Sequence, residues 1–302
     1  MHKNPYKARF IAGSRKCTTK TLSILLTQGL KQVKAFWENY CRAIRKNSGI
    51  ECMWILKNSQ VLSEILDTQG QLTYKNISTW DFSTLYTSIP HQDLIERLSK
   101  LVISVFTKTG HNYINVRCQK AFFSSKPYPG YHVWDVSKFT ELLEFLIMNI
   151  YVKFGSTILQ QHIGTPMGTN CAPLLADLYL FTYEYDYMQG LIKSKQLQKA
   201  RSFNLSFRYI DDLISIQNSY IRDAVKAIYP PSLELKETTD SLDGTSYLDL
   251  YLFKDNNGCI SRRLYDKRDD YNFAIVNYPF LDSNIPEGPA YGTYISRSYL
   301  FL

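Results

Sequence analysis

LSFRYIDDLISI, residues 205–216, places two adjacent aspartates between two runs of β-forming residues. Asp is an unfavourable strand residue, and neighbouring carboxylates repel each other. Asp pairs are common in ordinary turns, because their side chains bond nearby backbone N–H groups. Here the apolar flanks predict a hairpin that rises from a buried sheet, with Asp211 and Asp212 at its turn. Carboxylates clustered there need a cation, and hard oxygen ligands suit Mg²⁺.

A third carboxylate, Asp81, follows another predicted strand, residues 76–80. One Asp at a strand end and an Asp pair in a hairpin form the ligand set of a two-metal phosphoryl-transfer site. In such a site two ions about 3.5–4 Å apart stabilise the attacking and the leaving oxygen. One ion would activate a primer 3′-hydroxyl, and the other would hold a nucleoside triphosphate and its departing pyrophosphate. The protein then contributes placement and charge compensation.

The positive charge is concentrated at the start of the chain. The 302 residues carry 35 Lys and Arg against 27 Asp and Glu, a formal net charge of +8. Residues 1–50 hold 11 of the bases and one acid, Glu38, so the rest of the chain is close to neutral. Such a segment indicates a polyanionic partner, nucleic acid rather than a membrane surface, or else a solvated terminus.

Several classes of protein are excluded. The start, MHKNPYKARF, lacks the apolar region of a secretory signal, and the most apolar stretch, residues 142–152, is too short to cross a bilayer. The six cysteines lie far apart without a CxxC pair, which argues against a disulfide framework or a zinc site. We therefore expect an intracellular protein, nuclear or cytoplasmic and not secreted, with no membrane partner.

The pattern of apolar residues predicts the α+β class, an antiparallel sheet with helices on one face. Residues 109–135, rich in Gly, Pro, Ser and aromatics, predict an inserted loop, and Ser137 is expected to cap the next helix. Residues 193–201 predict a basic linker. Helices are expected over 21–46, 89–108, 137–150, 173–188 and 221–228, and strands over 151–154, 157–161 and 233–237, with a further hairpin around 255–258.

Four segments resemble, in order, motifs of reverse transcriptases. DFSTLY (81–86), GTPMGTNCAP (164–173) and FRYIDDL (207–213) resemble motifs A, B and C, and Arg9-Phe10-Ile11 resembles the end of the preceding fingers motif. RFIAGSRKCTTKTLS, SYLDLYLF and LYDKRDDYNFAIVNYPFLDSNIPEGPAYGTYIS are similar to segments of Penelope-like retroelement enzymes. The resemblance implies a right-hand polymerase fold, fingers and palm, with an antiparallel palm sheet backed by helices.

The resemblance also implies a division into domains. Residues 1–75 correspond to partial, basic fingers, and residues 76–265 to the palm, with a fingers insertion at about 92–160. Residues 266–302 correspond to a truncated palm-to-thumb segment. We therefore expect a fragment that lacks part of the fingers, most of the thumb and any endonuclease domain.

The resemblance implies a role for each matching residue. Asp81, Asp211 and Asp212 would be catalytic and would hold two Mg²⁺ ions, with Mn²⁺ as a substitute. Tyr86 matches the steric gate, where a ring under the sugar collides with a 2′-hydroxyl, although it also fits an ordinary core aromatic. Arg9 matches the arginine that clamps the triphosphate, or is a solvated Arg. The implied dNTP-binding residues are Arg9, Phe82, Tyr86, Pro166, Met167 and Gly168.

Other residues keep two interpretations each. Lys236 fits the lysine that protonates leaving pyrophosphate or a surface lysine, and residues 246–253 fit a primer grip or a core strand. The basic residues of the helix over 21–46 fit a track for template phosphates or a solvated face; they are Lys31, Lys34, Arg42 and Arg45.

The sequence thus predicts the RNA-directed DNA polymerase core of a retroelement, with an RNA template, a DNA primer and dNTPs as partners. An RNA-dependent RNA polymerase is a rival, which Tyr86 disfavours because ribonucleotide users need room for the 2′-hydroxyl. A second rival is an inactive retroelement remnant that only binds nucleic acid. A third alternative is that the protein is a relative of telomerase or of an intron maturase.

Overall fold

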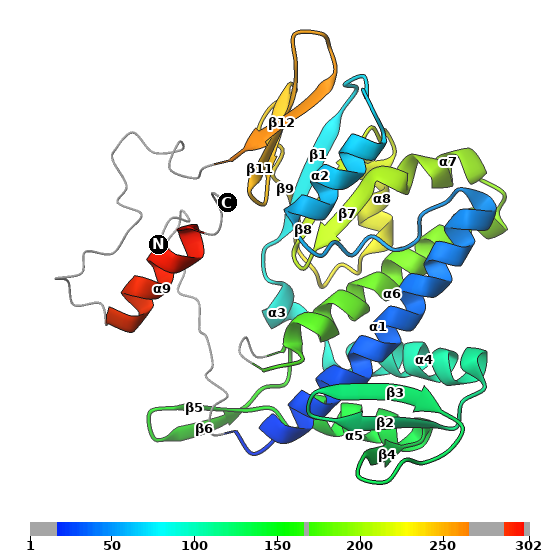
Figure 1. Ribbon diagram of the computed structural model, residues 1–302, viewed down its shortest axis with the longest axis vertical. Helices are drawn as coiled ribbons and strands as arrows, with labels where there is room; N and C mark the ends of the chain where they lie inside the picture. Colours follow the sequence, from blue (N-terminus) through cyan, green and yellow to red (C-terminus); the bar gives the residue numbers. More distant parts are fainter. Residues whose placement is uncertain (1–16, 166–168, 266–286, 299–302) are drawn as a thin grey trace. The chain divides into compact units, whose positions relative to one another are not determined.

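The computed structural model describes residues 17–165, 169–265 and 287–298. The chain divides into two compact units, Met1–Arg262 and Arg263–Leu302. In the second unit the described part contains helix α9 (Glu287–Ser298). The other elements, drawn in Figure 1, lie in the first unit, apart from the last two residues of β12 (Ile260–Leu264), which fall in the second.

A four-stranded antiparallel sheet organises the first unit. Its strand order is β7-β8-β1-β9, so the segment after residue 205 pairs with a strand that precedes it by more than 120 residues. The expected hairpin and the expected strand ending near Asp81 are thus neighbours. The strands are β7 (Ser206–Tyr209), β8 (Asp212–Ile216), β1 (Ile77–Phe82) and β9 (Leu235–Glu237).

The two faces of this sheet pack into two different hydrophobic clusters. Trp80, Phe82 and Leu213 join the larger cluster, which contains buried residues of most of the helices. Ile77 and Ile214, from alternate positions of the same strands, join a smaller one. Because side chains alternate along a strand, this pattern fixes which residues share a face. The expected α+β class, with an antiparallel sheet backed by helices, is confirmed, and most of the helices lie on one face.

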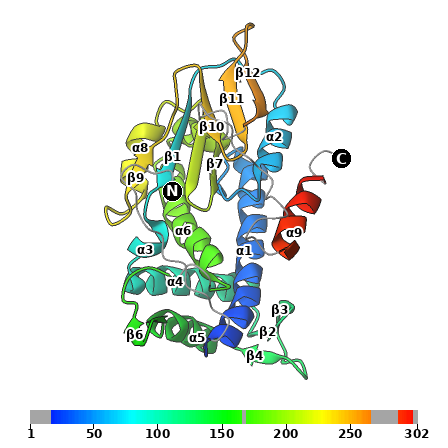
Figure 2. The ribbon, with the colours of Figure 1, turned by 90° about the vertical axis from the view of Figure 1, so that its left-hand side faces the viewer.

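Two long helices form the helical side. α6 (Ala172–Lys193) is buried on nearly all sides, as its central position requires. α1 (Lys20–Ser48) runs beside it (Figure 2) and ends at Gly49, whose φ of 69° allows a left-handed cap. The remaining short helices of this region are α3 (Leu85–Ser88), α8 (Ile221–Ile228), α7 (Leu197–Arg201) and the 3₁₀ helix η1 (Ser202–Leu205). The predicted linker at 193–201 is therefore wrong, because most of it is helical.

The opposite face carries a second sheet and one helix. Helix α2 (Ser59–Thr68) begins at Asn58, whose side chain accepts a hydrogen bond from the N–H of Val61. Three strands pair in the order β10-β11-β12: β10 (Gly244–Tyr247), β11 (Leu250–Lys254) and β12 (Ile260–Leu264). Residues 246–253, expected to form one strand, therefore form a hairpin.

The segment between β1 and α6 contains a small domain-like insertion. α4 (His91–Thr109) and α5 (Val136–Met148) flank a three-stranded sheet of order β3-β2-β4, and the predicted loop at 109–135 is wrong. Asp135, not Ser137, caps α5, since its carboxylate accepts the N–H of Lys138 at 2.7 Å. The strands are β2 (Tyr113–Arg117), β3 (Lys120–Ser124) and β4 (His132–Trp134), followed by the hairpin of β5 (Tyr151–Phe154) and β6 (Thr157–Gln160).

Within the described residues, no helix combines the length and the apolar character needed to cross a bilayer.

Adding a methyl group at two helical glycines is expected to change the stability of the protein in opposite directions. A Cβ at Gly29 of α1 would lie 2.9 Å from Cζ of Phe139, a fully buried ring, whereas nothing lies within 4 Å of one at Gly190 of α6. Gly29→Ala is expected to lower the free energy of unfolding by about 1–3 kcal/mol through overpacking. Gly190→Ala is expected to raise it by about 0.4–1 kcal/mol, because Ala loses less backbone entropy. Urea unfolding of both variants measures the two changes, and a gain for Gly29→Ala would contradict this packing.

Candidate active site

The three predicted aspartates come together at one end of the central sheet. Asp81 of β1 and Asp212 of β8 are direct register partners, so their side chains lie on the same face. The N–H of Phe82 donates to the carbonyl oxygen of Asp211 at 3.0 Å, which brings the turn next to β1. All three aspartates are half-buried. Like charges directly opposite each other destabilise a strand pair, so this placement favours a bound cation.

The donor set suits a hard cation, because it contains carboxylate oxygens and neither His nor Cys. Among the described residues, however, no group of three or more His, Cys, Asp or Glu side chains is already arranged to hold a metal ion. The backbone thus brings Asp81, Asp211 and Asp212 together, while their carboxylates do not converge on one point.

The hairpin turn carries backbone strain. Tyr209 pairs with Asp212, so the turn consists of Ile210 and Asp211, and the predicted turn at Asp211-Asp212 is wrong by one residue. Ile210 has a φ of 52°, a region that β-branched residues avoid and that Gly normally fills in such turns. Strain of this kind costs about 1–3 kcal/mol and persists where surrounding contacts impose it.

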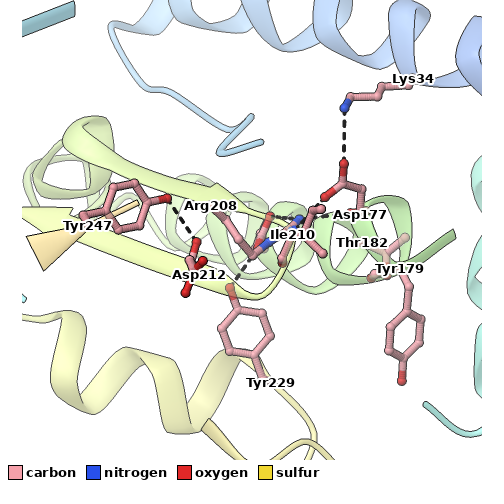
Figure 3. Close-up of polar contacts among 10 residues, drawn as sticks. Lys34, Asp177, Tyr179, Thr182, Arg208, Ile210, Asp212, Tyr229 and Tyr247 are labelled. Carbon is pink, nitrogen blue, oxygen red and sulfur yellow. Dashed lines mark hydrogen bonds and ion pairs between the residues drawn. The ribbon is translucent and has the colours of Figure 1, made fainter. Parts of the chain in front are cut away.

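Arg208 of β7 supplies one of these contacts from beneath the turn. Its side chain has no exposed surface, and its Nη1 donates to the carbonyl oxygen of Ile210 at 3.0 Å (Figure 3). Two acids of α6 balance its charge. Nε and Nη2 donate to the carboxylate of Glu184 at 2.5 and 3.3 Å, and Nη1 donates to Oδ1 of Asp177 at 3.0 Å. The central helix is therefore tied to the strained turn through one guanidinium.

Two tyrosine hydroxyls extend this network. Tyr229 donates to Oε1 of Glu184 at 2.8 Å, and Tyr247 of β10 donates to the carbonyl oxygen of Asp212 at 3.1 Å. Burial, with the Glu184 carboxylate next, raises the pKa of Tyr229. Burial and Asp212 likewise raise the pKa of Tyr247. Both phenols therefore remain neutral donors, and Tyr247 links residues 246–253 directly to the hairpin.

The guanidinium of Arg208 stays charged despite its burial. Burial by itself lowers the pKa of Arg208, but the carboxylates of Glu184 and Asp177 outweigh that effect and raise it overall. On the other side of Asp177, Nζ of Lys34 lies 3.3 Å from Oδ2 (Figure 3). Lys34 is thus engaged in the interior network, which disfavours its interpretation as part of a phosphate track.

The other basic residues of α1 differ from Lys34. Arg45 pairs with Glu51 at 2.9 Å, and Nη1 of Arg42 donates to the side chain of Asn39. Arg42, Arg45 and Lys31 are exposed. These three side chains therefore remain accessible to solvent on the outer surface of the helix.

Tyr86 lies in α3, four residues after the end of β1, beside the segment that resembles motif B. Its carbonyl oxygen accepts the N–H of Thr165 at 2.7 Å, and the N–H of Gly164 donates to Ile89 at 2.7 Å. Gly164 has a φ of 81°, and a Cβ there would lie 2.2 Å from the Tyr86 oxygen. Only glycine permits this approach. Nε2 of His91 contacts the Gly164 carbonyl oxygen at 2.6 Å and fastens the loop from the other side.

The environment of the Tyr86 ring reflects the nearby aspartates. Burial, followed by the charges of Asp211 and Asp177, raises the pKa of Tyr86 to about 12. The half-buried ring is therefore neutral at physiological pH, and it packs against the larger hydrophobic cluster. Arg9 and Pro166, Met167 and Gly168, the other predicted dNTP-binding residues apart from Phe82, lie outside the described residues.

Phe82 and Lys236 flank Asp81. The Phe82 side chain is 2% exposed and packs edge-on against Tyr229 with ring centroids 4.8 Å apart, so its backbone is the part that faces the turn. Lys236 of β9 is the register partner of Asp81 on the other side of β1, and its Nζ lies 3.2 Å from Glu234. Lys236 is therefore an exposed side chain next to the strand position of Asp81.

The structure adds residues that the sequence reasoning did not identify. Arg208 is the one charged residue of the buried strand β7, which is one signal of a buried ion pair. Asp177 and Glu184 are seven residues apart on one predicted helix and so share a face. A basic residue in a strand predicted to be buried, together with two acidic residues on one face of a helix, would have indicated this network.

Comparison with known proteins bears on the fold. No family model matches the chain, and no curated protein matches it either. Among solved structures, apo telomerase from Candida tropicalis aligns with 74% of this chain and 38% of its own at 15% identity, with a TM-score of 0.50. This chain has the fingers–palm fold of a nucleic-acid polymerase. It spans well under half the length of the telomerases that it resembles.

Two further structures are similar at lower scores. Telomerase from Candida albicans, in a complex with a TWJ fragment of telomeric RNA, has 17% identity and a TM-score of 0.49 over 78% of this chain and 38% of its own. An RNA polymerase complex inside a dsRNA virus has 14% identity and a TM-score of 0.42 over 84% of this chain and 21% of its own.

The Arg208–Glu184 pair predicts a non-additive mutational cycle. Glu184→Leu and Arg208→Met each remove one member of the buried pair and are expected to cost about 3–5 kcal/mol. The double variant Arg208→Met/Glu184→Leu replaces the pair by apolar groups and is expected to recover much of that loss. Urea unfolding of the four proteins gives the coupling energy. Additive losses in the double variant would show that the two side chains do not act as a buried pair.

Proposed function

We propose that this chain is the catalytic core of an RNA-directed DNA polymerase, a reverse transcriptase of the Penelope-like retroelement type. It would transfer a nucleotide from a dNTP to a primer 3′-hydroxyl on an RNA template. The observation that carries the proposal is the register pairing of Asp81 with Asp212, next to Asp211, within a polymerase fold.

The aspartates suit two Mg²⁺ ions, for which Mn²⁺ would be a substitute. Their oxygens are the ligands that such ions prefer, and a cation would relieve the repulsion between the facing carboxylates. When bound, the ions would supply Lewis-acid activation of the primer hydroxyl and neutralise charge on the leaving phosphate. Asp81, Asp211 and Asp212 would hold them, and binding would draw the three carboxylates together.

The other residues of the site would position the reactants. Arg208 and Tyr247 hold the backbone of the hairpin through the carbonyl oxygens of Ile210 and Asp212. Tyr86 presents a neutral, half-buried ring beside the segment that resembles motif B, and this position supports the proposed selection of deoxynucleotides. The basic segment over residues 1–50 supports contact with a template and primer.

Loss of one carboxylate is expected to abolish primer extension. Asp211→Asn keeps the size of the side chain but removes a charge that the ions need, so several kcal/mol of transition-state stabilisation would be lost. We expect dNTP incorporation on an RNA template with an annealed DNA primer to fall at least about a thousandfold. Asp243→Asn, an exposed site in the loop before β10, serves as the control and should leave the rate unchanged. Equal extension by wild type and Asp211→Asn would refute the assignment.

The Tyr86 ring is expected to exclude ribonucleotides. Tyr86→Ala removes the ring, and the preference for dNTP over NTP, measured as the ratio of kcat/KM values, should fall by about tenfold or more, or about 1.4 kcal/mol. Tyr86→Phe keeps the ring and should keep the preference. If wild type already prefers NTPs, the chain is an RNA polymerase. If Tyr86→Ala leaves the ratio unchanged, Tyr86 is a structural aromatic.

A further inference from the structure

The insertion between β1 and α6 carries an unbalanced positive charge. Residues 97–134 contain six Lys and Arg residues and no Asp or Glu. Arg97 and Lys100, at the start of this stretch, pair with acids of α4 and α6. Among ion pairs between described residues, none involves Arg117, Lys120 or Lys126. These three cations belong to the small sheet or to its loop.

The small sheet has one face in the core and one face outside it. Ile114 and Phe123 pair in register and belong to the core side, where α1, α4 and α5 pack (Figure 1). The next register positions place Asn115 opposite Phe122 and Arg117 opposite Lys120 on the other face. The outer face is therefore aromatic and cationic.

A proline-containing loop adds two tyrosines to this face. Residues 125–131, SKPYPGY, fold back over the sheet, because the N–H of Tyr128 donates to the side chain of Asn115 at 2.9 Å. Phe122 meets Tyr128 and Tyr131 edge-on, with ring centroids 5.0 and 5.3 Å apart. Tyr128 remains 49% exposed. Pro127 and Pro129 restrict the loop, so the exposed ring is held at little cost in entropy.

Arg117 is fixed across one of these rings. Its guanidinium carbon lies 4.2 Å from the ring centroid of Tyr131, and its Nε donates to the carbonyl oxygen of Gly130 at 2.5 Å. Gly130 has a φ of 75°, and a Cβ there would lie 2.3 Å from the guanidinium, so glycine is required for the contact. Arg117 is nevertheless exposed, with donors left for an anion.

We propose that this outer face binds single-stranded RNA. Unpaired bases would stack on Tyr128 and on the accessible part of Phe122, and phosphates would contact Arg117, Lys120 and Lys126. Aromatic platforms beside cations bind single strands because every base has a face that can stack, whereas the bases of a duplex are already stacked. The site goes beyond the proposed polymerase function, since binding there requires none of the three aspartates.

The stacking part is tested by fluorescence anisotropy with a labelled single-stranded oligouridylate and the full chain. Tyr128→Ala should weaken binding by about fivefold or more, the effect of losing one stacked base. Tyr151→Ala is the matched control, because Tyr151 is also exposed, at 54%, but lies on the β5–β6 hairpin. The control should bind as wild type, and a labelled RNA duplex should not distinguish the two variants. Equal affinity of Tyr128→Ala and wild type for the single strand would overturn the proposal.

The electrostatic part is tested by the salt dependence of the same binding. Arg117→Gln should reduce the slope of log affinity against log salt concentration by about 0.7, the value for one phosphate contact on a single strand. Lys138→Gln, an exposed cation on α5 that pairs with Glu141, is the control and should leave the slope unchanged. An unchanged slope for Arg117→Gln would remove Arg117 from the site.

Photocrosslinking avoids any effect of substitution on folding. Wild-type protein irradiated with oligouridylate that contains 4-thiouridine should crosslink to peptides that include Phe122 or Tyr128. Crosslinks confined to other segments would overturn the proposal. The same crosslink in Asp211→Asn would show that binding at this site does not require catalysis. If the wild-type protein crosslinks here but never extends a primer, the polymerase proposal fails and this one stands.

Discussion

A buried guanidinium is the interaction on which the candidate site depends. Arg208 joins two acids of α6 to the carbonyl oxygen of Ile210, so helix, strand and turn share one charge network. Desolvating this cation is expensive, and the carboxylates of Glu184 and Asp177 offset that cost. The network also fixes the backbone just before Asp211. A rigid support suits phosphoryl-transfer chemistry, in which the protein contributes mainly placement of charge.

The strand register determines where Asp81 lies relative to Asp212. A shift by one residue would move Asp81 to the opposite face of β1, away from Asp212. That shift is prevented because both faces of the sheet are buried, Trp80 in one cluster and Ile77 in the other. Two apolar cores therefore determine where the polar end of the sheet lies, and the aspartates gather at that end.

The spacing of apolar residues in the sequence correctly predicted those helices and strands whose formation depends on that spacing. The spacing of apolar residues gave the helix ending near Ser48 and the whole of α8, and the alternating flanks of Asp211 gave the hairpin. The three short strands of the insertion were missed, because the Gly, Pro and Ser residues of the 109–135 segment are typical of loops and the strands are stabilised by packing on α1 and α5. The contacts of Arg208 with Glu184 and Asp177 join residues 24 and 31 positions apart, which no local pattern reports.

The difference between local patterns and long-range contacts also changes the interpretation of the basic residues. A count of Lys and Arg treats Lys34 and Arg117 alike, yet Lys34 contacts an interior carboxylate whereas Arg117 lies exposed on an aromatic ring. A cation that neutralises Asp177 contributes to the polymerase fold and has little left to attract a phosphate. A cation in a segment without Asp or Glu is not neutralised, so it can still attract a phosphate. Contact with nucleic acid is therefore to be sought on the inserted sheet and at the exposed cations of α1, Lys31, Arg42 and Arg45, rather than at Lys34.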